Sequence, residues 1–479
     1  MSLIATDKEA RPPVRIVHLG IGAFFRAFGL AYLERLNATI ASPDQRYGVM
    51  GVSFRSAAVR DALAAQDFVY TTLERGADGD IARTISSLRD VALSTEEQAR
   101  ILAQMADEAV SIVSLTITEK GYCHQDGALD LAHPAIAHDI VNPEDPVSAP
   151  GYIVAALAMR HKAGIAPFTC LSCDNLSDNG RLLAHIVIEL AERIDPELAA
   201  WIKADVRFPI TMIDRIVPAT TDADRAHVAA IIGHEDRAPV IHEAFSQWVI
   251  EDDFGVLGRP DFGVVGAQLV ADVAPFESMK LRCLNGSHTA LAILGSLHGK
   301  TTVSDAISDP ALSAFIDNLW HREICPSVDV PDGVNIAEYC QALRDRYSNA
   351  AIVHHTAQIA TDTSKKLPPR ILAPLMDNLH ACQPVSSLSL ILAGWMFFIR
   401  STHLAGDIIN DPLADRFITI IQDTVDGDAY VTAMLEIDSI FSPDFTRHET
   451  VIESIMNWYR KIETDGIDAC LRHAAKEAI

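Results

Sequence analysis

The chain has 479 residues, of which 49% are hydrophobic and 22% charged, and this composition is typical of a folded globular protein rather than a disordered one. The 39 basic and 64 acidic residues give a formal net charge of −25, which argues against nucleic acid or an anionic membrane as a partner. A chain of this length exceeds one ordinary hydrophobic core, so two domains are expected.

Cysteine usage and the N-terminal sequence predict a reducing compartment. The eight cysteines are scattered, and only Cys170 and Cys173 have C-x-x-C spacing, so we expect reduced, mostly buried thiols and no metal site. The N-terminus lacks the basic and apolar regions of a signal peptide, and no apolar run reaches the length of about 18 residues that a membrane span needs. A cytoplasmic protein without a membrane partner is therefore expected.

In chain order, the first predicted element is a buried strand at residues 14–19, which leads through Gly20 and Gly22 into a helix. A strand, a glycine turn and a helix begin dinucleotide-binding folds, because the glycines let a pyrophosphate approach the helix N-terminus. The third glycine of the G-x-G-x-x-G pattern is absent, with Phe25 in its place. A tight turn without a ligand is therefore the alternative to a cofactor site.

Three further buried strands are predicted, at residues 47–54, 110–117 and 167–173. In NAD enzymes, an acid near the end of the second strand holds the ribose hydroxyls. Here the second strand runs into Arg55, and the next acid is Asp61, which leaves NADP open beside NAD. Asn175 follows the last of these strands, where it could cap a helix or reach a ligand at the carboxyl edge of the sheet.

From about residue 275 onward, apolar residues recur every three to four positions, which predicts helices rather than strands. The clearest helical segments are residues 305–319, 335–347, 388–400 and 451–464. The expected fold class is therefore α/β. A Rossmann-type dinucleotide-binding domain is predicted over residues 1–274, followed by a mostly α-helical substrate and catalytic domain over residues 275–479.

The stretch from Glu277 to His288 is the candidate for catalysis. Read as an α-helix, at about 100° per residue, it places Lys280, Asn285 and His288 within an arc of about 140°. A lysine desolvated in a cleft has a lowered pKa and can act as a general base, while Asn and His can donate hydrogen bonds to a carbonyl or alkoxide oxygen. The alternative is a solvent-exposed helical turn with ordinary polar side chains.

This stretch resembles the signature of the polyol-specific long-chain dehydrogenase family, also called the mannitol dehydrogenase family. A second resemblance lies near the N-terminus, where residues 20–28 are similar to the family's G-x-G-x-F-H-R-A-H pattern. The matching positions are Gly20, Gly22, Phe24, Arg26 and Ala27. Phe25 and Phe28 replace histidines, so no role of those imidazoles transfers to this chain. The expected cofactor-binding residues are Gly20, Gly22, Phe24, Arg26 and Arg55.

The resemblance implies a metal-independent oxidoreductase that passes a hydride between a secondary alcohol and NAD, with NADP as the alternative. Lys280 is implied as the general base. The groups implied to hold the developing alkoxide are Asn285, His288 and Asn175. The residues implied to bind the substrate are Asp214, Lys366 and Arg370. The active site is expected in the cleft between the two domains.

Within the family, the chain resembles the fructuronate reductase group at Gln358, at residues 118–122 and in the K-L-P-x-R pattern of Lys366 and Arg370. The expected reaction interconverts a keto sugar acid and its alcohol, D-fructuronate and D-mannonate, since a carboxylate needs a cation in its site. The alternatives are a mannitol- or arabinitol-type polyol dehydrogenase, a non-catalytic nucleotide-binding module and a zinc-dependent enzyme. A monomer or weak homo-oligomer is expected.

Overall fold

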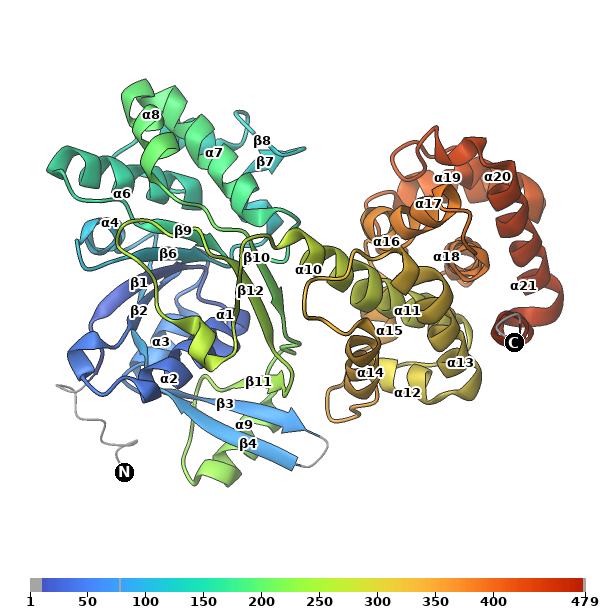
Figure 1. The fold of residues 1–479 in the computed structure, drawn as a ribbon, viewed down its shortest axis with the longest axis horizontal. Helices are drawn as coiled ribbons and strands as arrows, with labels where there is room; N and C mark the ends of the chain where they lie inside the picture. The colour runs from blue at the N-terminus through green and yellow to red at the C-terminus, as the bar shows by residue number, and fades with distance from the viewer. Residues whose placement is uncertain (1–10, 77–78, 477–479) are drawn as a thin grey trace. The chain divides into compact units, whose positions relative to one another are not determined.

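The computed structural model of this chain describes residues 11–76 and 79–476. The chain divides into two compact units, Met1–Ala274 and Pro275–Ile479. The first unit is a parallel sheet layered with helices, and the second is built from helices (Figure 1). The predicted fold class, a Rossmann-type domain followed by a mostly helical one, is therefore confirmed.

The central sheet of the N-terminal unit is parallel and has the strand order β5-β2-β1-β6-β9. Its strands are β1 (Val14–Leu19), β2 (Gly48–Ser53), β5 (Leu88–Leu93), β6 (Ile112–Leu115) and β9 (Thr169–Ser172). The chain first adds strands on one side of β1 and then, from β6 onward, on the other side. Open sheets of this kind bind ligands outside the carboxyl ends of the strands where the order reverses.

Helices cover both faces of this sheet, because parallel strands bury both of their faces. The covering helices are α1 (Ala23–Ala27), α2 (Gly29–Thr39), α4 (Gln98–Ala106), α6 (Ala149–Ala163) and α7 (Asn179–Ile194). Val17 of β1 belongs to the core formed with α4, α6 and α7, whereas its neighbour Ile16 belongs to the core formed with α1 and α2. Adjacent residues of one strand point to opposite faces, so β1 contributes to two cores. Figure 1 shows α4, α6 and α7 grouped on one side of the sheet.

The remaining elements of the N-terminal unit form smaller sheets and connecting helices. One mixed sheet contains β10 (Thr211–Asp214), β12 (Gln247–Glu251) and β13 (Gln268–Val270). Another contains β11 (Val240–Glu243), β3 (Tyr70–Gly76) and β4 (Gly79–Ile85), and a short pair contains β7 (His124–Gln125) and β8 (Ala128–Leu129). The further helices are α3 (Ala58–Ala64), α5 (Pro134–Val141), α8 (Pro196–Asp205) and α9 (Asp222–Ile232).

The C-terminal unit packs its helices around α18 (Ser386–Leu404), which is buried along most of its length. Helix α11 (Ser287–Leu297) lies close against it, since a Cβ atom on Gly394 would come within 2.5 Å of the Leu294 side chain. Helix α21 (Glu449–Lys476) bends at Gly466, which has a φ of +80°. The other helices are α10 (Ala274–Met279), α12 (Val303–Ser308), α13 (Pro310–Leu319), α14 (Ile336–Tyr347), α15 (Thr356–Ile359), α16 (Thr363–Leu367), α17 (Ala373–His380), α19 (Ala414–Asp423) and α20 (Gly427–Leu435).

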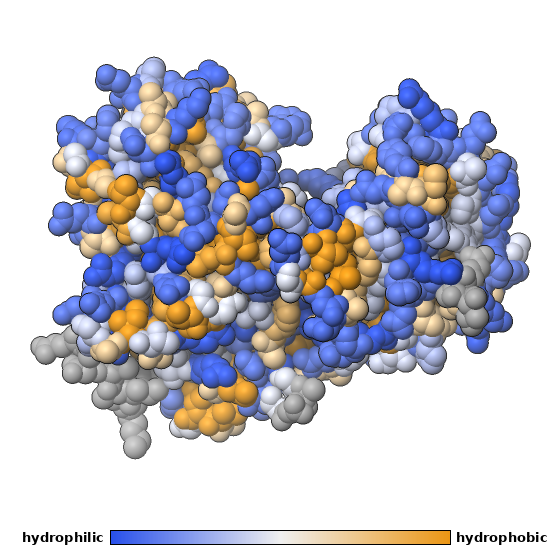
Figure 2. Space-filling view, in the orientation of Figure 1, coloured by the Kyte–Doolittle hydropathy of each residue, from blue (hydrophilic) through white to orange (hydrophobic). Residues whose placement is uncertain are grey.

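The surface in Figure 2 is mostly hydrophilic, with separate hydrophobic areas on each unit. This agrees with a chain whose large aliphatic and aromatic side chains are gathered in buried clusters. Within the part of the chain that the structure describes, no helix is both long enough and apolar enough to span a bilayer.

Candidate functional site

A pocket of about 470 Å³ lies at the carboxyl ends of β1, β2 and β6. This volume falls in the range of small-molecule sites. Lining residues from those strand ends include Gly20, Gly22, Ser53, Arg55, Thr116 and Thr118. Three of the residues predicted to bind the cofactor, Gly20, Gly22 and Arg55, therefore lie at one pocket, and it occupies the edge where a doubly wound sheet takes a dinucleotide.

The backbone conformation beside this pocket requires glycine at position 20. Its φ is +93°, and a Cβ atom there would come within 2.1 Å of the Thr116 carbonyl oxygen. The turn is held by the Gly20 amide, which donates to the Val52 carbonyl at 2.9 Å. Gly22 meets no such obstacle, since the nearest atom to a Cβ there would be 3.8 Å away. Gly20 thus shapes the turn, while Gly22 leaves open space beside the pocket.

Phe24 and Arg26, also predicted to serve the cofactor, do not line this pocket among the described residues. The Phe24 ring stacks on Phe28, with centroids 5.1 Å apart. The buried Arg26 guanidinium donates to the Ala238 carbonyl at 2.7 Å and lies over the Tyr70 ring. These contacts show that both side chains help to pack α1. Their role in cofactor binding stays a prediction.

Phe25, which stands where the family pattern has a histidine, stacks on the buried His18 ring with centroids 3.3 Å apart. His18 is hydrogen-bonded at both ring nitrogens, to Ser114 Oγ and Thr116 Oγ1, each at 2.8 Å. Burial holds the pKa of His18 well below its ordinary value, so this imidazole is neutral. The His18 imidazole of β1 therefore has a packing role, and both of its ring nitrogens are already hydrogen-bonded.

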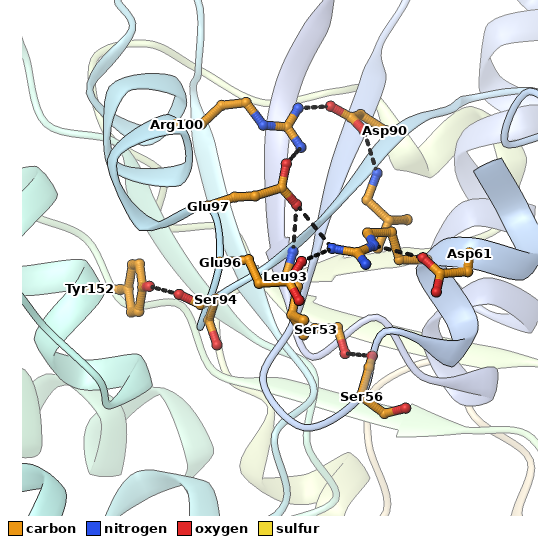
Figure 3. Close-up of polar contacts among 12 residues, drawn as sticks. Ser53, Ser56, Asp61, Asp90, Leu93, Ser94, Glu96, Glu97, Arg100 and Tyr152 are labelled. Atoms are coloured by element: carbon orange, nitrogen blue, oxygen red, sulfur yellow. Dashed lines mark hydrogen bonds and ion pairs between the residues drawn. The ribbon is translucent and has the colours of Figure 1, made fainter.

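No Asp or Glu lines this pocket among the described residues, whereas Arg55 and Ser56 do. The carboxylates nearby are engaged with arginines, as Figure 3 shows for Glu97 and Arg100. Asp61 accepts from Arg60 at 2.9 Å, so the first acid after β2 forms an exposed ion pair. The structure thus keeps the NADP alternative open, because the usual acid for the ribose hydroxyls is missing from the lining.

Asp174, which the sequence analysis passed over, holds the loop that follows β6. Its buried carboxylate accepts from the backbone amides of Ile117 at 3.1 Å and Thr118 at 2.8 Å, and from the Tyr122 hydroxyl at 2.9 Å. Thr118 has a φ of +62°, a strained value for a β-branched residue. Asp174 therefore fixes a strained residue of the pocket wall, and its neighbour Asn175 is exposed just beyond β9.

The polar stretch predicted for catalysis lies in the C-terminal unit and has a different helical form from the one expected. The α-helix predicted from Glu277 to His288 is wrong, because Lys280–Gly286 forms a π-helix, η5, between α10 and α11. Its hydrogen bonds run from residue i to residue i+5, so the angle of 100° per residue does not apply there. Such segments are frequent at functional sites.

The three polar residues of this stretch are buried, which excludes the solvent-exposed alternative. The exposed fractions are 5% for Lys280, 9% for Asn285 and 8% for His288. Asn285 Oδ1 and His288 Nε2 have no hydrogen-bond partner among the described residues. A buried polar atom without a partner costs about 1–3 kcal/mol, so these two atoms mark a place where a polar ligand would be stabilised.

His288 is held as a neutral imidazole. Its ring stacks on Tyr347 with centroids 5.4 Å apart and meets the His354 ring edge-on at 4.7 Å. Burial, together with the positive charge of neighbours such as Arg370, holds the pKa of His288 well below its ordinary value. A neutral ring can donate or accept at Nε2 without bringing charge into the site.

One predicted substrate-binding cation, Arg370, comes from a segment that packs against η5. Arg370 lies on the π-helical segment η8 (Pro368–Leu372), and its carbonyl oxygen would lie 2.9 Å from a Cβ on Gly286. Its guanidinium donates to Thr289 Oγ1 at 3.1 Å, and no carboxylate is paired with it among the described residues. Burial lowers the pKa of Arg370 to about 10. A partly buried guanidinium without a carboxylate can bind an anionic group.

Lys366 lies on α16 and is bonded to the residues just before that helix. Its ammonium donates to the carbonyl oxygens of Ile359 at 3.0 Å and Thr361 at 2.5 Å. Burial, followed by the charge of Arg370, lowers its pKa. Since an ammonium has three N–H donors, one is left for a ligand.

The predicted site residues thus fall in two groups. Lys280, Asn285 and His288 belong to the C-terminal unit with Lys366 and Arg370. Asn175 and Asp214 belong to the N-terminal unit, where Asp214 is buried at the end of β10. The roles assigned to them stay predictions.

Comparison with known proteins identifies the family. The mannitol dehydrogenase Rossmann domain matches residues 14–262, and the mannitol dehydrogenase C-terminal domain matches residues 272–463. D-mannonate oxidoreductase of Escherichia coli (strain K12) is 41% identical over 472 residues, which cover 97% of this chain and 96% of that protein. Mannitol 2-dehydrogenase of Phaeosphaeria nodorum is 34% identical over 469 residues, which cover 96% and 81%.

A solved structure agrees with these relatives. The ternary complex of Pseudomonas fluorescens mannitol 2-dehydrogenase with NAD and D-mannitol matches with a TM-score of 0.84 at 33% identity, over 99% of this chain and 97% of that one. The two family domains, the relatives and the solved structure therefore identify the same family. The chain belongs to the mannitol dehydrogenase family and is a nicotinamide-dependent oxidoreductase of secondary alcohols.

Proposed function

We propose that the protein interconverts a keto sugar acid and its alcohol, of the D-fructuronate and D-mannonate type. The observation that carries this proposal is Arg370, a partly buried guanidinium without a carboxylate partner among the described residues, on a segment packed against η5. A sugar acid brings a carboxylate that a neutral polyol lacks, and a guanidinium binds it through two parallel hydrogen bonds. The 41% identity to D-mannonate oxidoreductase supports the same substrate class.

In this proposal Lys280 is the general acid and base. The bound nicotinamide dinucleotide supplies or takes the hydride. During oxidation, the Lys280 amine removes the proton of the reacting hydroxyl, and during reduction it returns that proton. His288, neutral and with an unpartnered Nε2, donates a hydrogen bond to the developing alkoxide in its Nε2-protonated form. The Asn285 amide and Asn175 are the further groups proposed to hold substrate oxygens, and Asp214 is proposed to bind the substrate.

A substrate panel followed through nicotinamide absorbance tests the substrate class. We expect D-mannonate oxidation and D-fructuronate reduction, with mannitol and arabinitol turned over poorly. Arg370→Gln should raise KM for D-mannonate about 10–100-fold, the value of a hydrogen-bonded charge, and leave KM for mannitol nearly unchanged. Arg416→Gln, at an exposed arginine, is the matched control and should change neither value.

A polyol dehydrogenase is the second candidate, because the matching P. fluorescens structure contains D-mannitol. Wild-type protein that turns over mannitol or arabinitol readily and D-fructuronate not at all would replace the sugar-acid assignment with this one. Equal loss for both substrates in Arg370→Gln would instead assign that arginine to folding of the site.

NAD is proposed as the working cofactor, with NADP as the alternative. The NAD in the related P. fluorescens structure supports the first, whereas Arg55 and the lack of a lining acid among the described residues favour the second. Measurement of kcat/KM with each cofactor decides between them. A strong preference for NADP that disappears in Arg55→Ala would overturn the NAD assignment.

A further inference from the structure

Three cysteines from separate segments of the C-terminal unit meet at one point. Cys283 lies on η5, Cys325 begins the short helix η7 (Cys325–Ser327), and Cys340 lies on α14. Their sulfur atoms all lie within 4.8 Å of one another, and the Sγ atoms of Cys325 and Cys340 are 3.6 Å apart. All three are free thiols. Chain positions this far apart converge only because η5, η7 and α14 pack together.

The spacing of these sulfurs suits ligands of one metal ion. A tetrahedral zinc ion with sulfur ligands at about 2.3 Å places neighbouring sulfurs about 3.8 Å apart. A disulfide would need about 2.05 Å. The 3.6 Å between Cys325 and Cys340 is close to the first distance and far from the second.

The cluster can be reached from the surface. A pocket of about 510 Å³ is lined by Cys325, Cys340 and His321, while Cys283 is fully buried. An ion that enters this pocket would bind the three sulfurs as thiolates, because the thiolate and not the thiol binds metal.

We infer that Cys283, Cys325 and Cys340 form a binding site for one thiophilic cation of the zinc class, with Cys283 on the same helical segment as Lys280. A tetrahedral ion held by three thiolates keeps a fourth position for water. Binding replaces the thiol protons by the metal and releases them to solvent. No redox step is involved, and the hydride chemistry proposed above does not pass through this ion.

The position of the site gives it a structural consequence. The ion would join η5 to α14, and α14 carries Tyr347, whose hydroxyl donates to the Leu284 carbonyl at 2.9 Å and whose ring stacks on His288. Occupancy would therefore hold the His288 ring and the Lys280 segment together. A ligand that binds only the folded protein also raises its stability by mass action.

Titration of the full-length, reduced, metal-free protein with Cd²⁺ tests this inference. Cadmium bound to thiolates absorbs in the ultraviolet through charge transfer, so the signal reports sulfur ligands alone. We expect the band to saturate at one equivalent and Zn²⁺ to displace it. We also expect Zn²⁺ to raise the melting temperature. Cys325→Ser, at a partly exposed position, and Cys340→Ser should lose both effects while keeping a wild-type circular dichroism spectrum.

Matched variants exclude the other metal-binding groups. Cys470→Ser changes a buried thiol elsewhere in the unit and should keep the full band. His448→Ala removes a member of the His380, Asp444 and His448 group, which could also hold an ion, and should likewise keep it. The inference would be overturned by an absent band in the reduced wild type. An unchanged band in Cys325→Ser, or a Cys325–Cys340 disulfide that forms readily in protein saturated with Zn²⁺, would overturn it as well.

Discussion

Lys280 is the residue on which the proposed chemistry depends, since it lies buried in η5 beside two unpartnered polar atoms. We expect Lys280→Ala to lower kcat by about 10²–10⁴-fold, the usual size of a general-base contribution. Cofactor affinity, measured by fluorescence titration, should stay close to wild type because the pocket proposed for the cofactor is in the other unit. Lys280→Arg keeps the charge and should be equally inactive. Near-normal kcat in either variant would remove Lys280 from the role of base.

Asn285 and His288 are expected to act on the transition state rather than on folding. Each donor to an oxyanion contributes up to about 3–4 kcal/mol, so Asn285→Ala and His288→Ala should lower kcat by about 10²–10³-fold. Loss of the ring packing on Tyr347 should lower the melting temperature of His288→Ala, but neither variant removes a hydrogen bond at Asn285 Oδ1 or His288 Nε2, since these atoms have no partner among the described residues. A fall in stability with unchanged kinetics would return both residues to a structural role.

At the scale of an element, the loop after β6 depends on Asp174. Asp174→Asn replaces a carboxylate that accepts from Ile117, Thr118 and Tyr122 with an amide that has a single acceptor oxygen. We expect a loss of about 1–3 kcal/mol in the free energy of unfolding and a KM for the cofactor raised about tenfold, since Thr118 lines the pocket in a strained conformation.

Tyr122→Phe is the matched control for this loop, because it removes one hydrogen bond to Asp174 and leaves the two backbone bonds in place. Its KM for the cofactor should stay near that of wild type. An equal rise of KM in both variants would show that the Tyr122 hydroxyl, and not the hydrogen bonds from the Ile117 and Thr118 amides to Asp174, positions the pocket wall.

At the scale of the whole molecule, buried histidines make the protein sensitive to acid. The pKa values of His18, His288 and His354 are lowered by burial, and that of His242 is lowered to about 4. The unfolded chain therefore binds more protons than the folded chain below pH about 6.5, so stability falls as the pH decreases through that value. We expect a loss of about 1 kcal/mol per such histidine at pH 5.5 relative to pH 7.5.

Urea unfolding at several pH values measures this loss. His242→Gln, which replaces a side chain with a folded-state pKa of about 4, should make the slope of stability against pH shallower by one proton. A stability that is constant between pH 7.5 and pH 5.5 would contradict the protonation account.

Much of this protein could be predicted from the sequence, because the signals are local. The strand at residues 14–19, the Gly20 turn and the periods of three to four after residue 275 each follow from neighbouring residues. The family followed from short motifs in order along the chain, and the family comparisons confirm it. The turn after β1 was predictable because it is also a local feature: Gly20 has a φ of +93°, which glycine adopts without strain.

The tertiary structure decided what depends on distant partners. The segment Lys280–Gly286 forms a π-helix, and it lies against the Arg370 carbonyl of η8, more than 80 positions further along the chain. The meeting of Cys283, Cys325 and Cys340 depends on the packing of η5, η7 and α14. The pKa values of His288 and Arg370 depend on burial, which no local pattern encodes. Motifs name the chemical groups, but their exposure and charge are set by the rest of the fold, because desolvation is a property of the surroundings and not of the residue.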